Sequence, residues 1–411
     1  MKQMTIFEKR NTAMRHRALI VFGAVVLSVM TYPSNSIASD KINNKDAIPW
    51  SKKMQALYKT LADLLTDITS DQRFNNPLNK SRIQNEADQL SGLAHDLTKK
   101  RMISVDSDPT IQIVAGLLRR ETKRAAVELK RGSREYARGI LRSVPNYCIA
   151  CHTRNASGPQ FAELSLEPSE KSLTSLDRGE FFAASRQFDR AQNEFRKVIN
   201  DAKGAEANIW NWERAVQHSL AIAVRVKKDP VQAGEIVQTI QGTPSAPSFM
   251  REDAKTWKTS ITDWKEELPR QPLTEEGLYA EATRLMAKAR EIQKYPMDRT
   301  ADILYLRASA VVHDLLQKAP EGVHSADALL LAGLSYEVLS PLKTEDLHEI
   351  YYEACIRKAP HSPTADLCYR RYEMDIFLEY TGSGGTDVPE DVRTRLLELL
   401  SLSQPLPAIR K

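Results

Sequence analysis

The chain of 411 residues has few cysteines and lacks the common catalytic signatures. Four cysteines are too few to form a disulfide scaffold in a chain of this length. The sequence contains no glycine-rich phosphate loop, no His-Glu-x-x-His and no Gly-x-Ser-x-Gly. These absences argue against a P-loop nucleotidase, a zinc protease and a serine hydrolase. We therefore expect no enzyme and no catalytic residues.

Residues 1–38 have the pattern of a signal peptide. Five Lys or Arg and one Glu precede an apolar run at residues 18–30, and Ser36-Ile37-Ala38 forms a small-residue cleavage site. The run is shorter than the roughly 20 residues that a transmembrane helix needs, although an uncleaved anchor is the alternative. We expect an exported protein, located in the periplasm, with no membrane span after cleavage.

Charge is distributed unevenly along the chain. The formal net charge is +5, but the leader carries +4 of it, so the remaining chain is near +1 and does not indicate nucleic-acid binding. Between Arg119 and Arg154 there are ten Lys or Arg and three Glu. A solvated helix face is the ordinary explanation of such a run. The functional alternatives are that it attracts an acidic redox partner or lies beside the acidic groups of a cofactor.

The motif that decides the function is Cys148-Ile149-Ala150-Cys151-His152. Cys-x-x-Cys-His is the attachment pattern of a c-type haem, in which two thiols bond covalently to the haem and the imidazole becomes an axial iron ligand. A zinc site would need two more ligands, and Cys355 and Cys368 are not suitably spaced. A thioredoxin-like dithiol would follow a strand, and no strand is predicted before this motif. Because the motif occurs once, we predict one covalently attached haem c.

Apolar residues at steps of three and four predict four helices before and through this motif, separated by breaks at residues 73–80, 106–109 and 132–133. Pro145 should kink the fourth helix or start a turn there. Four short-looped helices with haem attached at the end of the last resemble the cytochrome c′ family, over about residues 45–155. The resemblance implies a four-helix haem-binding bundle, here assigned to residues 39–155, with His152 as proximal ligand. Members of this family often dimerise through their first two helices, so a homodimer is one expectation and a monomer, with that interface blocked by the added domain, is the alternative.

The second axial ligand is left open by the sequence. The resemblance implies either a five-coordinate iron with an apolar distal side or a six-coordinate iron bound by a Met. Met54 lies on the apolar stripe of the first helix, where a Met is more often plain core. His95 flanks the stripe of the second helix, where most lone histidines are not ligands. Met102 is a weaker candidate, and a vacant site would be lined by Leu57 or Leu61.

Residues 156–175 are predicted to be a linker, and residues 176–411 to be helical throughout. Residues 181–198 and 324–360 resemble tetratricopeptide units, in which a large residue and small residues close one helix, an aromatic residue ends the turn, and Ala begins the packing face of the next helix. Such pairs should stack as an α-solenoid, and a non-repeat helical domain is the alternative. Cys355 and Cys368 flank a predicted turn, where a disulfide and two separate thiols are equally compatible with the sequence.

The sequence thus predicts an all-α, periplasmic, monohaem c-type cytochrome that carries electrons to or from a protein partner held by its repeat domain. The alternative is a gas-binding or redox-sensing haem protein with an open distal iron site. A peroxidase would need a distal acid–base group, for which only His95 is available.

Overall fold

The computed structural model describes residues 50–98, 109–154, 173–201, 203–267, 274–296, 298–339 and 347–406. The expected leader, Met102 and most of the expected linker lie outside these ranges. All described residues belong to one compact unit, residues 48–411. They are almost wholly helical, which confirms the all-α class.

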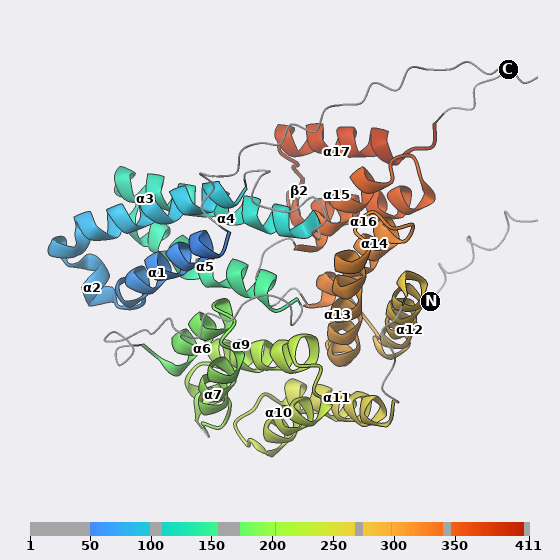
Figure 1. Cartoon of the computed structure of the whole chain (residues 1–411), viewed down its shortest axis with the longest axis horizontal. Coiled ribbons are helices and arrows are strands. Elements are labelled where there is room, and N and C mark those ends of the chain that lie inside the picture. The colour runs from blue at the N-terminus through green and yellow to red at the C-terminus, as the bar shows by residue number, and fades with distance from the viewer. Residues whose placement is uncertain are drawn as a thin grey trace, which may run out of the picture. The chain divides into compact units, whose positions relative to one another are not determined.

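The first part of the unit contains α1 (Trp50–Thr69), α2 (Asp71–Asn75), the 3-10 helix η1 (Pro77–Asn79), α3 (Lys80–Leu97), α4 (Pro109–Arg131) and α5 (Arg134–His152). The apolar stripes expected from the sequence are buried: Leu61 and Leu64 of α1 and Ile83 and Leu90 of α3 are at most 1% exposed. Helix α1 packs against α3, α3 against α4, and α4 against α5 (Figure 1). The four long helices therefore share one core.

One local expectation in this part is corrected, and one of the two alternatives for Pro145 is excluded. Residues 73–80, expected as a loop, contain the end of α2 and the turn η1, because Ser70 caps α2 by accepting a hydrogen bond from the Arg73 N–H and Phe74 is buried beneath it. Helix α5 continues through Pro145 to His152 without starting a new turn. Pro109 does begin α4, as its fixed φ favours.

The second part of the unit carries the remaining elements. They are α6 (Ser175–Ala184), α7 (Phe188–Ile199), α8 (Gly204–Ala207), α9 (Ile209–Ala221), the π-helix η3 (Ile222–Val226), α10 (Pro230–Gly242), α11 (Ser248–Glu266), α12 (Glu275–Ile292), α13 (Asp302–Lys318), α14 (Ser325–Leu339), α15 (Leu347–Lys358), α16 (Pro363–Glu379) and α17 (Glu390–Ser403). A short exposed hairpin, β1 (Thr381–Gly382) and β2 (Gly385–Thr386), precedes α17.

Successive helices of this part pack closely in pairs, among them α6 with α7 and α14 with α15. A Cβ atom placed on Gly179 of α6 would lie 2.5 Å from the Phe195 ring of α7, and one on Gly333 of α14 would lie 2.7 Å from Cδ1 of Tyr352 in α15. Real Cβ atoms do not approach other atoms so closely. In each pair, therefore, an aromatic ring of one helix packs directly against a glycine of the other, at a position where a larger residue would clash.

The last four helices include the two remaining cysteines. Cys355 near the end of α15 and Cys368 in α16 are joined by a disulfide, with their Cα atoms 6.3 Å apart. Of the two arrangements compatible with the sequence, the structure has the bonded one. The bond closes the α15–α16 turn.

Candidate functional site

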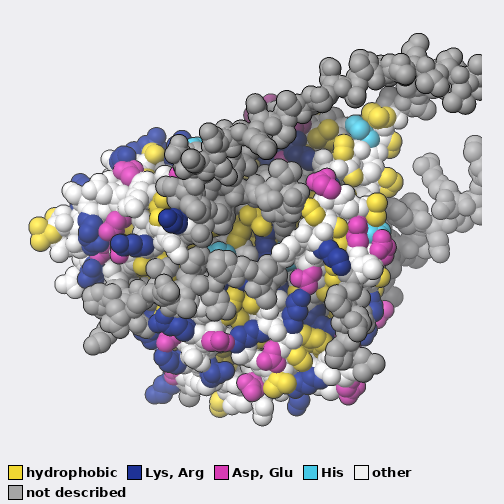
Figure 2. All heavy atoms as spheres, viewed as in Figure 1, with side chains coloured by type: hydrophobic (Ala, Val, Ile, Leu, Met, Phe, Trp, Pro, Cys, Tyr) yellow, Lys and Arg dark blue, Asp and Glu magenta, His cyan; other side chains and the backbone are white. Residues whose placement is uncertain are grey.

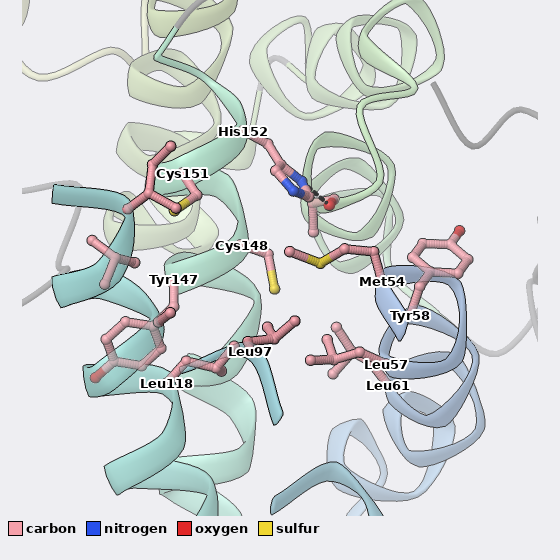
Figure 3. Close-up of a pocket in the computed structure, with 14 residues that line it drawn as sticks. Met54, Leu57, Tyr58, Leu61, Leu97, Leu118, Tyr147, Cys148, Cys151 and His152 are labelled. Atoms are coloured by element: carbon pink, nitrogen blue, oxygen red, sulfur yellow. Dashed lines mark hydrogen bonds between the residues drawn. The ribbon is translucent and has the colours of Figure 1, made fainter. Parts of the chain in front are cut away.

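The Cys148, Cys151 and His152 side chains lie in the last turn of α5. In a helix, positions i, i+3 and i+4 fall on one face, so the spacing brings all three side chains together. Neither cysteine forms a disulfide. All three line one cavity, and Figure 3 shows Cys148 and His152 beside it.

The rest of the cavity wall comes from helices distant in sequence. Helix α1 contributes Met54, Leu57 and Leu61, and α3, α4 and α6 supply further apolar residues. The free space that these side chains leave is about 50 Å³, and the cavity is partly open to solvent. Cofactor sites in proteins are lined mostly by apolar side chains. The cavity therefore has the chemistry of a site for an apolar cofactor, but as it stands it is smaller than such a group.

His152 is held by a backbone carbonyl from outside its own helix. Its Nδ1 lies 2.5 Å from the oxygen of Ala184, at the end of α6. Because a carbonyl can only accept, Nδ1 must donate, and Nε2 is left as the nitrogen with a free lone pair. Burial, together with the Arg186 guanidinium, lowers the pKa of His152 to about 4. The imidazole is thus neutral at neutral pH, the form that binds metals.

The turn after α6 is fastened to the site by further contacts. Arg186, which has a left-handed backbone conformation (φ 61°), donates from Nη1 to the His152 carbonyl at 2.9 Å. The Tyr58 ring, which lines the cavity, packs 4.4 Å from the Phe181 ring. The α6–α7 turn therefore fixes the orientation of His152. Sequence reasoning treated this segment only as part of a repeat and missed Ala184 and Arg186 as site residues.

The Cys148 thiol does not have the environment of a reactive dithiol. Burial, and then the neighbouring Cys151, raise the pKa of the Cys148 thiol to about 12. Catalytic Cys-x-x-Cys pairs have the opposite property, a thiol pKa lowered well below its ordinary value. The environment of Cys148 is thus inconsistent with a thioredoxin-like role.

The structure separates the candidates for the distal ligand. Met54 lines the cavity, and its thioether extends across it toward Cys148 and His152 (Figure 3). His95 is exposed and lines a different hollow, between α4 and α15. Met102 lies outside the described residues. Of the two candidate ligands that the structure describes, Met54 lines the cavity that contains the motif and His95 does not.

The described residues contain no group of three or more His, Cys, Asp or Glu side chains suited to hold a metal ion. A haem iron needs fewer protein ligands, because the porphyrin nitrogens supply four of its bonds, so His152 with or without Met54 is a sufficient donor set. Among the helices that the structure describes, none is long and apolar enough to cross a membrane. Comparisons with models of known families, with characterised proteins and with solved structures give no match for this chain.

Proposed function

We propose that the protein is a periplasmic monohaem c-type cytochrome that carries electrons to or from a protein partner. The observation that carries this proposal is the convergence of Cys148, Cys151 and a neutral His152 on one apolar cavity faced by the Met54 thioether. The spacing of the motif explains why the two cysteines and His152 converge. Met54 comes from a helix almost a hundred residues earlier in the chain and completes a donor set that suits haem.

The residues of this site have distinct roles in the proposal. Cys148 and Cys151 would hold the haem through thioether bonds, and Nε2 of His152 would be the proximal iron ligand. Bound haem supplies a one-electron Fe(III)/Fe(II) couple. The Ala184 carbonyl keeps the His152 ring in one tautomer and orientation. Apolar walls that include Leu57 and Leu61 would limit the access of water to the haem and so the rearrangement that accompanies a change of charge.

The packing of the chain supports the architecture expected from the sequence. The shared core of α1, α3, α4 and α5 is what a cytochrome c′-like four-helix bundle requires. The glycine–aromatic contacts within α6–α7 and α14–α15 are what tetratricopeptide-like pairs require. We propose that the second of these regions, residues 176–411, holds the partner close to the haem and so raises its effective concentration.

The alternative function, a gas-binding or redox-sensing haem protein, is favoured by the composition of the cavity. Met54 is the one possible iron ligand among the described side chains that α1, α3 and α4 present to the cavity. The others are apolar, except Tyr58, whose ring packs against Phe181. An iron not bound by Met54 would keep an open position on an apolar side.

The first experiment is production of the full chain together with a c-type haem attachment system. We expect haem to remain bound after denaturation, and Cys148→Ser with Cys151→Ser to abolish this, whereas Cys355→Ser with Cys368→Ser should not. An intact mass that corresponds to cleavage after residue 38 plus one haem would support export. A chain that emerges without covalent haem would refute the proposal.

Absorption spectra of the oxidised, reduced and CO-treated holoprotein separate the two functions. A low-spin spectrum that CO does not change indicates a sixth protein ligand and favours electron transfer. A far-red band in the oxidised form then indicates Met ligation. A high-spin spectrum that shifts with CO favours gas binding.

A further inference from the structure

A groove between α4 and the C-terminal helices α15 and α17 is strongly positive. Among the described residues, seven Arg or Lys side chains and three Asp or Glu side chains line its roughly 1430 Å³, and α3 forms part of its edge. On the face drawn in Figure 2, positive and negative side chains are interspersed. The chain beyond the leader is near neutral overall, so the groove concentrates positive charge.

The acidic residues of the groove are already paired with cations. Asp88 lies 2.9 Å from Lys130, Glu128 lies 2.8 Å from Arg131, and Glu353 lies 2.7 Å from Arg357. They do not neutralise the cations of the central part of α4.

Arg119 and Lys123, in that central part, are exposed and form no ion pair within the described chain. Arg120 and Arg124 flank them and share the single carboxylate of Glu121, at 3.0 and 3.9 Å. One face of α4 therefore presents cations whose charge the described part of the chain leaves largely uncompensated.

We infer that this groove binds an acidic segment of a partner protein. The cations from Arg119 to Arg131 span twelve residues of helix, about 18 Å at 1.5 Å per residue. An extended chain rises about 3.3 Å per residue, so five or six residues of the partner match this length. Leu117, Val127 and Ile350 lie among the charges and provide contacts for one or two aliphatic side chains.

Other polyanions fit the groove less well. Single-stranded nucleic acids are held by aromatic side chains on which bases stack, and the described lining contains no Phe, Tyr or Trp, with the imidazole of His95 as its single ring. A flat membrane surface would meet only the rims of a groove that is walled by helices on two sides. An acidic peptide can enter it and satisfy charges on both walls.

The position of the groove relates it to the haem cavity. Val114 and Leu118 of α4 face the cavity, while Arg119 and Lys123 face the groove. A bound segment would therefore lie about one helix diameter, roughly 10 Å, from the cavity. The identification of the partner as a redox protein rests on the proposed function, whereas binding of an acidic segment does not.

The test measures binding of a fluorescein-labelled peptide, Ser-Glu-Leu-Glu-Glu-Leu-Glu-Ser, to the full chain by fluorescence anisotropy. At an ionic strength of about 0.01 M, surface charges act over about 30 Å. Under these conditions we expect Arg119→Gln with Lys123→Gln to weaken binding about five- to tenfold. Arg142→Gln with Lys258→Gln removes two exposed charges outside the groove and should weaken binding less than twofold.

Three outcomes would overturn the inference: equal weakening by both double variants, equal binding of a peptide with Gln for every Glu, or tighter binding of a thymidine hexanucleotide than of the peptide. Circular dichroism of each variant confirms that it is folded. Because the readout is the peptide and not the haem, this test gives a result whether or not the chain carries covalent haem. It therefore stands if the haem proposal fails.

Discussion

Replacement of Gly333 by alanine tests whether α14 and α15 pack as closely as the structure indicates. The new methyl group would lie 2.7 Å from Cδ1 and 2.8 Å from Cζ of Tyr352. Tyr352 cannot swing aside, because it is fully buried and its hydroxyl donates to Glu337. Overpacking of this kind costs about 1–3 kcal/mol. The substitution also gains about 0.5–1 kcal/mol of helix propensity, which partly hides the clash.

Gly139 of α5 provides the matched control. It lies on an exposed helix face, and a Cβ there would meet no atom within 4 Å. Gly139→Ala should therefore stabilise the protein by about 0.5–1 kcal/mol. Because the propensity gain is common to both variants, the difference between their free energies of unfolding isolates the clash, and we expect it to be about 1–3 kcal/mol.

Urea denaturation followed by circular dichroism measures both variants against the parent protein. A double-mutant cycle with Tyr352→Leu completes the test. Removal of the ring should cost less in the Gly333→Ala background, because it also relieves the clash. If Gly333→Ala is as stable as Gly139→Ala, or if the cycle shows no coupling, the close approach of α14 and α15 is wrong.

Three further predictions concern the site, a carboxylate and the disulfide. If Met54 binds the iron of the proposed haem, Met54→Ala should lower the reduction potential and make the iron accessible to CO, because a Met ligand raises the potential. Leu61→Ala, which removes a neighbouring cavity residue, should do neither. Burial first, and nearby carboxylates second, raise the pKa of Asp253 to about 6. The folded protein therefore binds this proton more tightly than the unfolded chain, and stability falls as pH rises from about 4 to 6. Asp253→Asn should stabilise the protein by about 1 kcal/mol at pH 7.5, after allowance for solvent screening, and not at pH 4, as thermal melts at both pH values will show; a pH-independent gain would contradict the argument. Loss of the disulfide in Cys355→Ser with Cys368→Ser should cost about 3 kcal/mol, the loop entropy of a sequence separation of 13. Reductant should destabilise the parent protein by a similar amount in urea melts and leave the variant unchanged.

Much of the local structure follows from the sequence alone, because it depends on spacing within one helix. The apolar positions of α1 and α3 recur every three or four residues, and the structure buries them. Cys148, Cys151 and His152 fall on one helix face wherever that helix lies in the protein. Pro109 could be recognised as a helix start because a proline suits the first turn.

The short helix α2 was missed because its stability depends on contacts beyond its own five residues. Phe74 is buried in the shared core, and Arg134 of α5 donates to its carbonyl. Asn76 and Pro77 indicated a break correctly, but not that a helical turn precedes it. A helix this short is not stable by propensity alone.

Tertiary structure decided what the sequence left open, since those questions concern residues far apart in the chain. Periodicity placed both Met54 and His95 at apolar stripes, and only the packing of α1 and α3 directs the first to the cavity and leaves the second exposed. The Ala184 carbonyl that orients His152 is 32 residues away and has no side-chain signature. The tertiary fold alone places this carbonyl beside His152, because its position depends on how α6 packs against α5. The sequence by itself therefore determined the motif and the helices, and the fold determined which atoms surround the motif.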